Sequence, residues 1–236
     1  MALIIGAFAD YHKAEYHRNL KKERALCEAQ MATIYSLVKL LESRDAKSVF
    51  HVERVSLLCK LLSEKMQQIT RYQNKVNDAF SDNLYKTAPL HDIGKVGIPD
   101  RILLKPGKLT NDEFEVMKTH AAIGANTLSE VHNKYPGNDF LEFGIAITRS
   151  HHEKWDGSGY PDGLIGEKIP LAARIVALID VYDALRSERV YKLAYSHEKA
   201  IEIIKENRGK HFDPDLVDVF VAHEDEFKAA FDQFGN

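Results

Sequence analysis

The sequence contains few cysteines and no long apolar run. Its two cysteines, Cys27 and Cys59, form neither a CxxC pair nor a disulfide framework, so a reducing cytoplasm is the expected location. A thiolate-rich ligand set is also missing, which excludes a structural zinc finger. The apolar opening, residues 2–9, is too short to span a bilayer and lacks the basic start of a secretory signal. We therefore expect no membrane span.

A strong excess of either charge is absent as well. The 236 residues carry a formal net charge of -3, with 28% of them charged. This mild acidic balance does not support general affinity for a nucleic-acid polymer. Recognition of a phosphate group would therefore depend on a local cluster of cations.

The alternation of apolar and polar residues that marks a β-strand is missing, whereas helical spacing recurs. Apolar residues at helical intervals predict helices within residues 26–41, 52–66, 111–128 and 171–185. Asp213 followed by Pro214 is typical of an N-cap with proline in the first helical position. Glycine and proline predict breaks at residues 94–107 and 157–170. The predicted fold class is all-α.

The first part of the chain has a different character. Residues 12–30 mix charges of both signs, which favours a solvated helix face over a linker helix that contacts a partner. An amphipathic helix at residues 31–43 is expected to pack on the domain or to form a homodimer with a second copy. We therefore assign residues 1–43 to an N-terminal helical linker and residues 44–236 to the main domain.

Metal-capable residues stand side by side at two places in the chain. His151 and His152 are adjacent, and His91 precedes Asp92 directly. Neighbours on a helix point about 100° apart, so they rarely chelate one ion together. They can each reach a different ion, and a carboxylate such as Asp92 can bridge two. This pattern predicts a binuclear metal centre and favours a hydrolase.

Three further residues extend this set. His51 begins a predicted helix, and His120 lies on the buried side of another. Asp180 interrupts an otherwise apolar helix, where a carboxylate needs a cation or strong hydrogen bonds. Asp180 alone has simpler explanations, a helix cap or an ion pair with Arg174, and a single His-Asp dipeptide is weak evidence. The conjunction favours a metal site.

Imidazole and carboxylate ligands suit borderline divalent cations. Two Fe(II) or Mn(II) ions are expected, with Ni(II), Zn(II) and Mg(II) as alternatives. The other histidines lack neighbouring ligand types. Surface positions are expected for His12, His17, His132, His197 and His223, and a structural role for His211.

These residues, in this order, resemble the HD-GYP family, a branch of the HD-domain metal-dependent phosphohydrolases. The similarity covers about residues 44–222. It is carried by residues 51–55, 91–100, 103–109, 117–120, 151–163 and 177–185. The resemblance implies an HD-type helical bundle with a GYP loop, residues 159–161, and an extra N-terminal helix.

The resemblance also implies an activity, the hydrolysis of the bacterial second messenger cyclic di-GMP to linear pGpG, which many members continue to GMP. Our own hypothesis for the nucleophile is a hydroxide bridging the two ions, because metal coordination lowers the pKa of bound water towards neutrality. Asp92 and Lys95 would be the catalytic residues, and Lys95, Arg189 and Lys192 would bind phosphate. The implied metal ligands are His51, His91, Asp92, His120, His151, His152 and Asp180, with His91 on one ion and His120, His151 and His152 on the other.

One position departs from the family pattern. Some members place a glutamate four residues before the first histidine, where it helps to hold a third metal. Lys47 occupies that position here, and an ammonium group cannot act as a ligand. We therefore expect two ions and pGpG as the product.

Several alternatives remain open at this stage. The chain could hydrolyse another cyclic dinucleotide such as cyclic GMP-AMP, or bind the messenger as a receptor without turnover. The GYP loop could form the edge of the substrate pocket, present a surface to a partner such as a diguanylate-cyclase domain, or be a tight turn only.

Overall fold

The computed structural model describes residues 2–43, 50–188 and 193–234. It divides into two compact units, Met1–Leu37 and Val38–Asn236. The first unit consists of most of helix α1 (Ala2–Glu42), and the side chains of residues 12–30 that the structure describes are almost all exposed. The mixed charges of this segment therefore face solvent, as expected.

The second unit is a helical bundle. Beyond the last turn of α1 it contains α2 (His51–Met66), α3 (Asp78–Thr87), the 3-10 helix η1 (Ala88–Gly97), α4 (Asp100–Leu103), α5 (Asn111–Lys134), α6 (Asp139–Ser150), the 3-10 turn η2 (Gly166–Lys168), α7 (Leu171–Arg186), α8 (His197–Glu206), α9 (Pro214–Ala222) and α10 (Glu224–Asp232). The described residues include no β-strand beyond one isolated bridge, Arg208 with Phe212. The predicted all-α class is confirmed.

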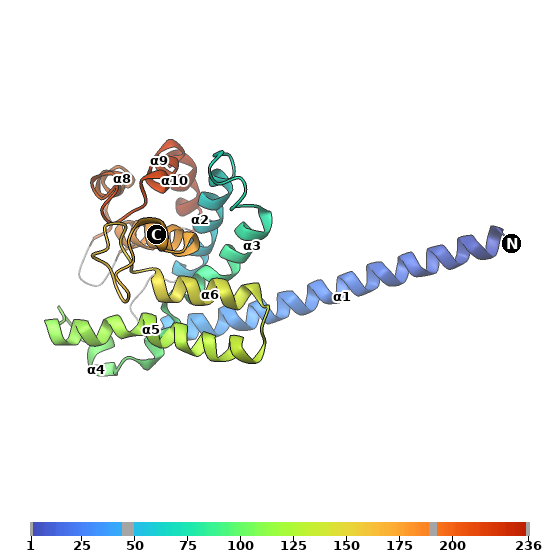
Figure 1. Cartoon of the computed structure of the whole chain (residues 1–236), viewed down its shortest axis with the longest axis horizontal. Helices are drawn as coiled ribbons and strands as arrows, with labels where there is room; N and C mark the ends of the chain where they lie inside the picture. Colours follow the sequence, from blue (N-terminus) through green and yellow to red (C-terminus); the bar gives the residue numbers. More distant parts are fainter. Residues whose placement is uncertain (1, 44–49, 189–192, 235–236) are drawn as a thin grey trace. The chain divides into compact units, whose positions relative to one another are not determined.

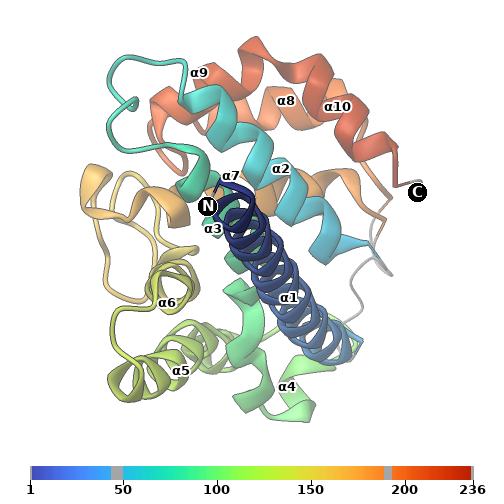
Figure 2. The same ribbon diagram turned by 90° about the vertical axis from the view of Figure 1, so that its right-hand side faces the viewer.

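Helix α7 occupies the centre of this unit. Helices α8, α9 and α10 lie on one side of it, and α5 and α6 lie on the other (Figures 1 and 2). Most of its residues are buried on all faces, including Ile175, Leu178 and Ile179, and they pack with α2 in the main core. An apolar helix with no solvent face is stable only in such a position. Two charged residues of α7, Arg174 and Asp183, are buried there as well, and Asp180 is partly buried.

The structure confirms the predicted cap of α9 and corrects one of the predicted breaks between helices. Asp213 caps α9 as predicted, since its side chain accepts a hydrogen bond from the backbone N–H of Asp215. The predicted break at residues 94–107 is wrong in its first part, because η1 continues to Gly97 and α4 follows. Proline at the first turn of η1 suits a helix start, and the glycines there permit close packing.

His197 corrects another expectation, because it is buried rather than on the surface. Its Nδ1 lies 2.9 Å from the hydroxyl of Tyr182, at the contact between α8 and α7. None of the helices in the described part of the chain combines the length and apolar character of a membrane span.

Candidate metal centre

The 3-10 helix η1 carries His91 and Asp92 into close contact with α5. A Cβ atom at Gly94 would lie 2.0 Å from the carbonyl oxygen of His120, so only glycine permits this approach. The side-chain hydroxyl of Thr148, on α6, donates to the carbonyl of Leu90 and holds η1 from the other side. These contacts bring residues from three helices to one point.

Four candidate ligands form a first group here, each with a ligand atom within 4.8 Å of the others: Asp92, His120, His151 and His152. The Nε2 atoms of His120 and His151 are 3.5 Å apart. Asp92 Oδ1 lies 3.4 Å from the first of these nitrogens and 3.8 Å from the second. Donor atoms at such separations can surround a single cation.

A second group lies on the other side of Asp92 and consists of His51, His91 and Asp180. Asp180 Oδ1 is 3.7 Å from His51 Nε2 and 3.8 Å from His91 Nε2. Asp180 thus faces two histidines, whereas Arg174, its suggested alternative partner, forms an ion pair with Asp213. Asp180 is the carboxylate that interrupts the apolar sequence of α7, and the structure places it beside the imidazole rings of His51 and His91.

Asp92 lies between the two groups. Its Oδ2 is 3.2 Å from His91 Nε2, while its Oδ1 faces His120 and His151. The two oxygens of one carboxylate therefore point to different groups, which is the geometry that a bridging ligand requires.

The histidine tautomers suit metal binding. The Nδ1 atoms of His91, His120 and His151 lie 2.7–3.2 Å from backbone carbonyl oxygens. A carbonyl only accepts, so each Nδ1 carries the proton and each Nε2 carries the lone pair. Such contacts fix the ring orientation of metal-ligating histidines. The residues present therefore fit a pair of divalent ions.

His51 is oriented by a carboxylate instead. Its Nδ1 is 2.7 Å from Oδ2 of Asp183, which also accepts hydrogen bonds from the guanidinium of Arg54. All three side chains are buried. Burial alone would raise the pKa of Asp183, but the hydrogen bonds from His51 and Arg54 outweigh it and lower the pKa. Asp183 is thus a carboxylate that holds His51 with Nε2 toward Asp180.

Burial keeps the first group's histidines neutral. It is the main cause that lowers the pKa of His151 far below its usual range, with His152 and His91 adding to the effect. Burial and the neighbouring His120 lower the pKa of His152 to about 3. The pKa of His120 is also lowered by burial, although Asp92 opposes the shift. Neutral imidazole is the form that binds metal.

The GYP loop is anchored beside this group. The buried carboxylate of Glu153 accepts hydrogen bonds from three successive backbone N–H groups, those of Asp162, Gly163 and Leu164. A Cβ atom at Gly159 would lie 2.3 Å from the backbone nitrogen of Lys154, so the loop folds back too closely for any other residue.

The ring of Tyr160 packs on that of His152, with centroids 4.7 Å apart. Burial, and then Asp92 and Asp180, raise the pKa of Tyr160. Pro161 and Asp162 are exposed. The loop is therefore more than a tight turn: it borders the candidate metal centre on one side and solvent on the other.

Among the cationic residues expected to bind phosphate, the structure describes Lys95 only. Its ammonium lies 3.0 Å from Asp92 Oδ2 and is partly exposed at the edge of the cluster. Arg189, Lys192 and also Lys47 lie outside the described residues.

Three residues near the cluster were missed by sequence reasoning. Asp183 follows Asp180 by three positions, a spacing that places both on one helix face and that could have identified it. Glu153 and Glu42 had no such signal. Glu42, the last residue of α1, has its Oε1 atom 3.7 Å from His51 Nε2 and is largely buried.

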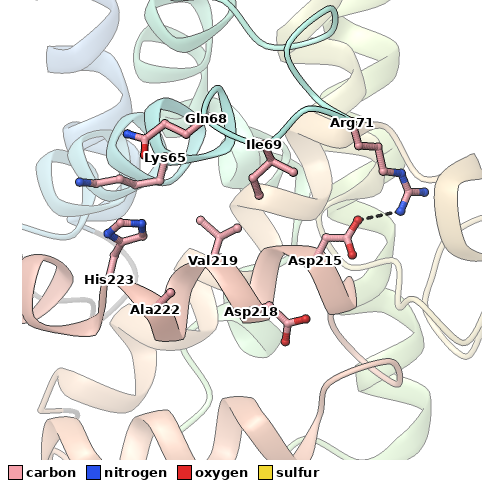
Figure 3. Close-up of a pocket in the computed structure, with 9 residues that line it drawn as sticks. All are labelled: Lys65, Gln68, Ile69, Arg71, Asp215, Asp218, Val219, Ala222 and His223. Carbon is pink, nitrogen blue, oxygen red and sulfur yellow. Dashed lines mark hydrogen bonds and ion pairs between the residues drawn. The ribbon is translucent and has the colours of Figure 1, made fainter.

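A separate groove lies away from these residues. It is formed by the C-terminal end of α2, the loop that follows and α9 (Figure 3). Its apolar floor includes Ile69 and Val219, and its rim carries Arg71, which forms ion pairs with Asp215 and Glu167. The groove shares no residue with the candidate metal centre.

Comparison with known families decides the identity of this bundle. The sequence model of the HD domain family matches residues 35–216, most of the chain. The chain belongs to the HD domain family. The resemblance to HD-type phosphohydrolases noted in the sequence is confirmed, and the matched HD domain includes every candidate ligand in both groups.

Similar proteins are cyclic-dinucleotide phosphodiesterases. A cyclic di-GMP phosphodiesterase of Vibrio cholerae is 51% identical over 196 residues, which cover 83% of this chain and 40% of that protein. The 3'3'-cGAMP-specific phosphodiesterase 2 of the same organism is 37% identical over 204 residues, 86% of this chain and 37% of that protein. The chain thus spans less than half the length of these relatives.

A solved structure has the same fold. The cyclic GMP-AMP specific phosphodiesterase of V. cholerae matches with a TM-score of 0.57 and 21% identity, covering 83% of this chain and 51% of that one. The predicted HD-type helical bundle is confirmed.

Proposed function

We propose that this chain is a metal-dependent phosphodiesterase that opens cyclic di-GMP to linear pGpG. The observation that supports it most directly is the position of Asp92 between two groups of metal-capable side chains. The identity to a cyclic di-GMP phosphodiesterase over most of the chain supports the same substrate.

Seven residues would hold two divalent ions: His51, His91 and Asp180 for one, His120, His151 and His152 for the other, and Asp92 for both. Glu42 adds a carboxylate oxygen near the first. Fe(II) or Mn(II) suits this mixture of imidazole and carboxylate, and Ni(II), Zn(II) or Mg(II) are weaker candidates. When bound, such ions activate water and neutralise phosphate charge.

The protein's own residues position the reacting groups. Asp92 keeps the two sites adjacent, and the hydrogen bonds to Nδ1 hold the histidine rings in place before substrate arrives. Lys95 has its ammonium at the edge of the cluster, where it can contact a non-bridging phosphate oxygen. Arg189 and Lys192 would add positive charge for the second phosphate.

Chromatography of the products tests this proposal. Protein loaded anaerobically with Fe(II) or Mn(II) should convert cyclic di-GMP to pGpG, while Asp92→Asn should lower kcat at least 1000-fold and keep the fold. Asp82→Asn is the matched control, because Asp82 is an exposed carboxylate that pairs with Lys60 and belongs to neither group. Full turnover by a folded Asp92→Asn variant would contradict the mechanism. Metal analysis should give two ions per chain, and a third would contradict the inference from Lys47.

A second substrate has specific support, because one relative is named as specific for 3'3'-cGAMP. Parallel assays with cyclic di-GMP and cyclic GMP-AMP identify the preferred substrate as the one with the higher kcat/KM. Binding of either dinucleotide without turnover by metal-loaded protein would instead indicate a receptor.

Two interaction surfaces remain proposals. Pro161 of the GYP loop and the adjacent Asp162 are both exposed and would contact a partner such as a diguanylate-cyclase domain. The exposed leucines of α1, Leu26, Leu37 and Leu40, would pair two copies of the chain. Size-exclusion chromatography with light scattering, on the wild type and a Leu37→Glu/Leu40→Glu variant, tests the second.

A further inference from the structure

An aromatic residue on α5 lies exposed beside the candidate metal centre. Phe114, in the first turn of that helix, is 47% exposed. Its ring stands edge-on to that of Tyr160, with centroids 6.3 Å apart. A single exposed apolar residue is common on a protein surface, but the position of Phe114 beside Tyr160 makes its ring available to a ligand at the site.

The rings form a continuous path from the cluster to the surface. His152 packs on Tyr160, and Tyr160 contacts Phe114. One ring, that of Tyr160, therefore separates Phe114 from the candidate metal ligand His152. This places an aromatic surface next to the site where the phosphate of the proposed substrate would bind.

A cation accompanies the outer rings. Lys118, one turn after Phe114 on α5, has its Nζ atom 5.8 Å from the centroid of the Phe114 ring and 5.7 Å from that of Tyr160. Lys118 also forms an ion pair with Glu115, whose side chain is 68% exposed. A pair this exposed contributes little and can be exchanged for a ligand at low cost.

We propose that Phe114, Tyr160 and Lys118 form a purine subsite, in which the base stacks on Phe114 and Lys118 donates to the O6 and N7 atoms of guanine. The inference rests on the proposed phosphodiesterase function and adds a base-recognition element to it. Stacking of a base on an aromatic side chain contributes about 1–3 kcal/mol by alanine substitution. Guanine presents two acceptors to a lysine, whereas adenine presents a donor at the equivalent position.

Kinetics of four proteins test the stacking. Phe114→Ala should raise KM for cyclic di-GMP about tenfold, with kcat within twofold of wild type and unchanged metal content. Phe114→Trp should restore the KM. Tyr135→Ala is the matched control, because Tyr135 is also an exposed aromatic residue and caps the opposite end of the same helix. A KM for Phe114→Ala within twofold of wild type would overturn the subsite while leaving the phosphodiesterase intact.

Base selection tests the role of Lys118. Lys118→Met keeps the length of the side chain and removes the ammonium. It should lower the ratio of kcat/KM for cyclic di-GMP over cyclic di-AMP about tenfold, and an unchanged ratio would remove Lys118 from the proposal.

A failure of the catalytic proposal can be distinguished. If the wild type does not hydrolyse cyclic di-GMP, the same proteins are titrated with it by calorimetry. Loss of binding in Phe114→Ala, with binding retained in Tyr135→Ala, would support the subsite in a receptor. Absence of binding by the wild type would overturn both proposals.

Discussion

Asp183 is a buried residue that orients His51, a candidate metal ligand, without belonging to either candidate group itself. Its carboxylate contacts His51 Nδ1 on one side and the Arg54 guanidinium on the other. This arrangement keeps the proton on Nδ1 and the lone pair on Nε2, the atom that faces Asp180. Carboxylate partners of this kind raise the basicity of ligating histidines.

We predict that Asp183→Asn lowers the affinity for divalent metal by about 10–100-fold, because the amide holds the His51 ring less firmly. Calorimetric titration with Mn(II) measures this. The substitution also weakens the ion pair with Arg54, so the protein should lose stability in urea by about 3 kcal/mol.

Asp213→Asn separates the two effects. Asp213 is also buried and pairs with an arginine, Arg174, but it contacts no candidate ligand. Its variant should lose comparable stability and keep the metal affinity of the wild type. Equal losses of metal affinity in both variants would show that Asp183 has no special role in orienting His51.

At the scale of secondary structure, the contact between η1 and α5 sets the geometry of the cluster. Gly94 and Gly124 face each other there, and added side-chain atoms at either would meet backbone of the other element. The geometry of the cluster therefore depends on glycine at positions 94 and 124, because a larger residue at either position would push η1 away from α5.

Gly94→Ala should therefore destabilise the protein by about 2 kcal/mol or more, as overpacking does, and should weaken metal binding by moving Asp92 from His120. Urea unfolding and metal titration measure the two effects. Gly97→Ala, on the same helix, is the control: its Cβ would meet only the flexible side chain of Ile123, 3.1 Å away. Equal stability of the two variants would show that glycine is not required at position 94.

At the scale of the whole domain, the candidate ligands join elements far apart in the chain. They come from α2, η1, α5, the end of α6 and α7, so bound ions would cross-link most of the bundle. A ligand that binds only the native state stabilises it by about 2.7 kcal/mol at a concentration 100 times its Kd.

We predict that chelation of the metals lowers the Tm by about 5–10 °C, given the usual shift of about 2–4 °C per kcal/mol for a domain of this size. Scanning calorimetry with Mn(II) and with EDTA measures the difference. A His120→Ala/His151→Ala variant should show a smaller difference in Tm between Mn(II) and EDTA. An identical Tm with and without metal in the wild type would contradict cross-linking by the ions.

The sequence by itself determined the helical class, the family and a compact set of metal-capable residues. Periodicity is a local property, so helices such as residues 51–66 and 171–186 are encoded in their own apolar spacing. The short helices α3, α6, α8 and α10 were not predicted, because their few turns carry too little periodic signal. His197 was misplaced for a related reason, since its partner Tyr182 belongs to another helix.

Only the tertiary structure decided that His51 and Asp180 join His91 in one group, and which residues support the candidate ligands. His51 and Asp183 are 132 positions apart, and no local pattern relates them. The same holds for Glu42 beside His51 and for Phe114 beside Tyr160. Metal-site geometry depends on how helices pack, which is set by the burial of apolar surface along the whole chain and not by the residues of the site alone.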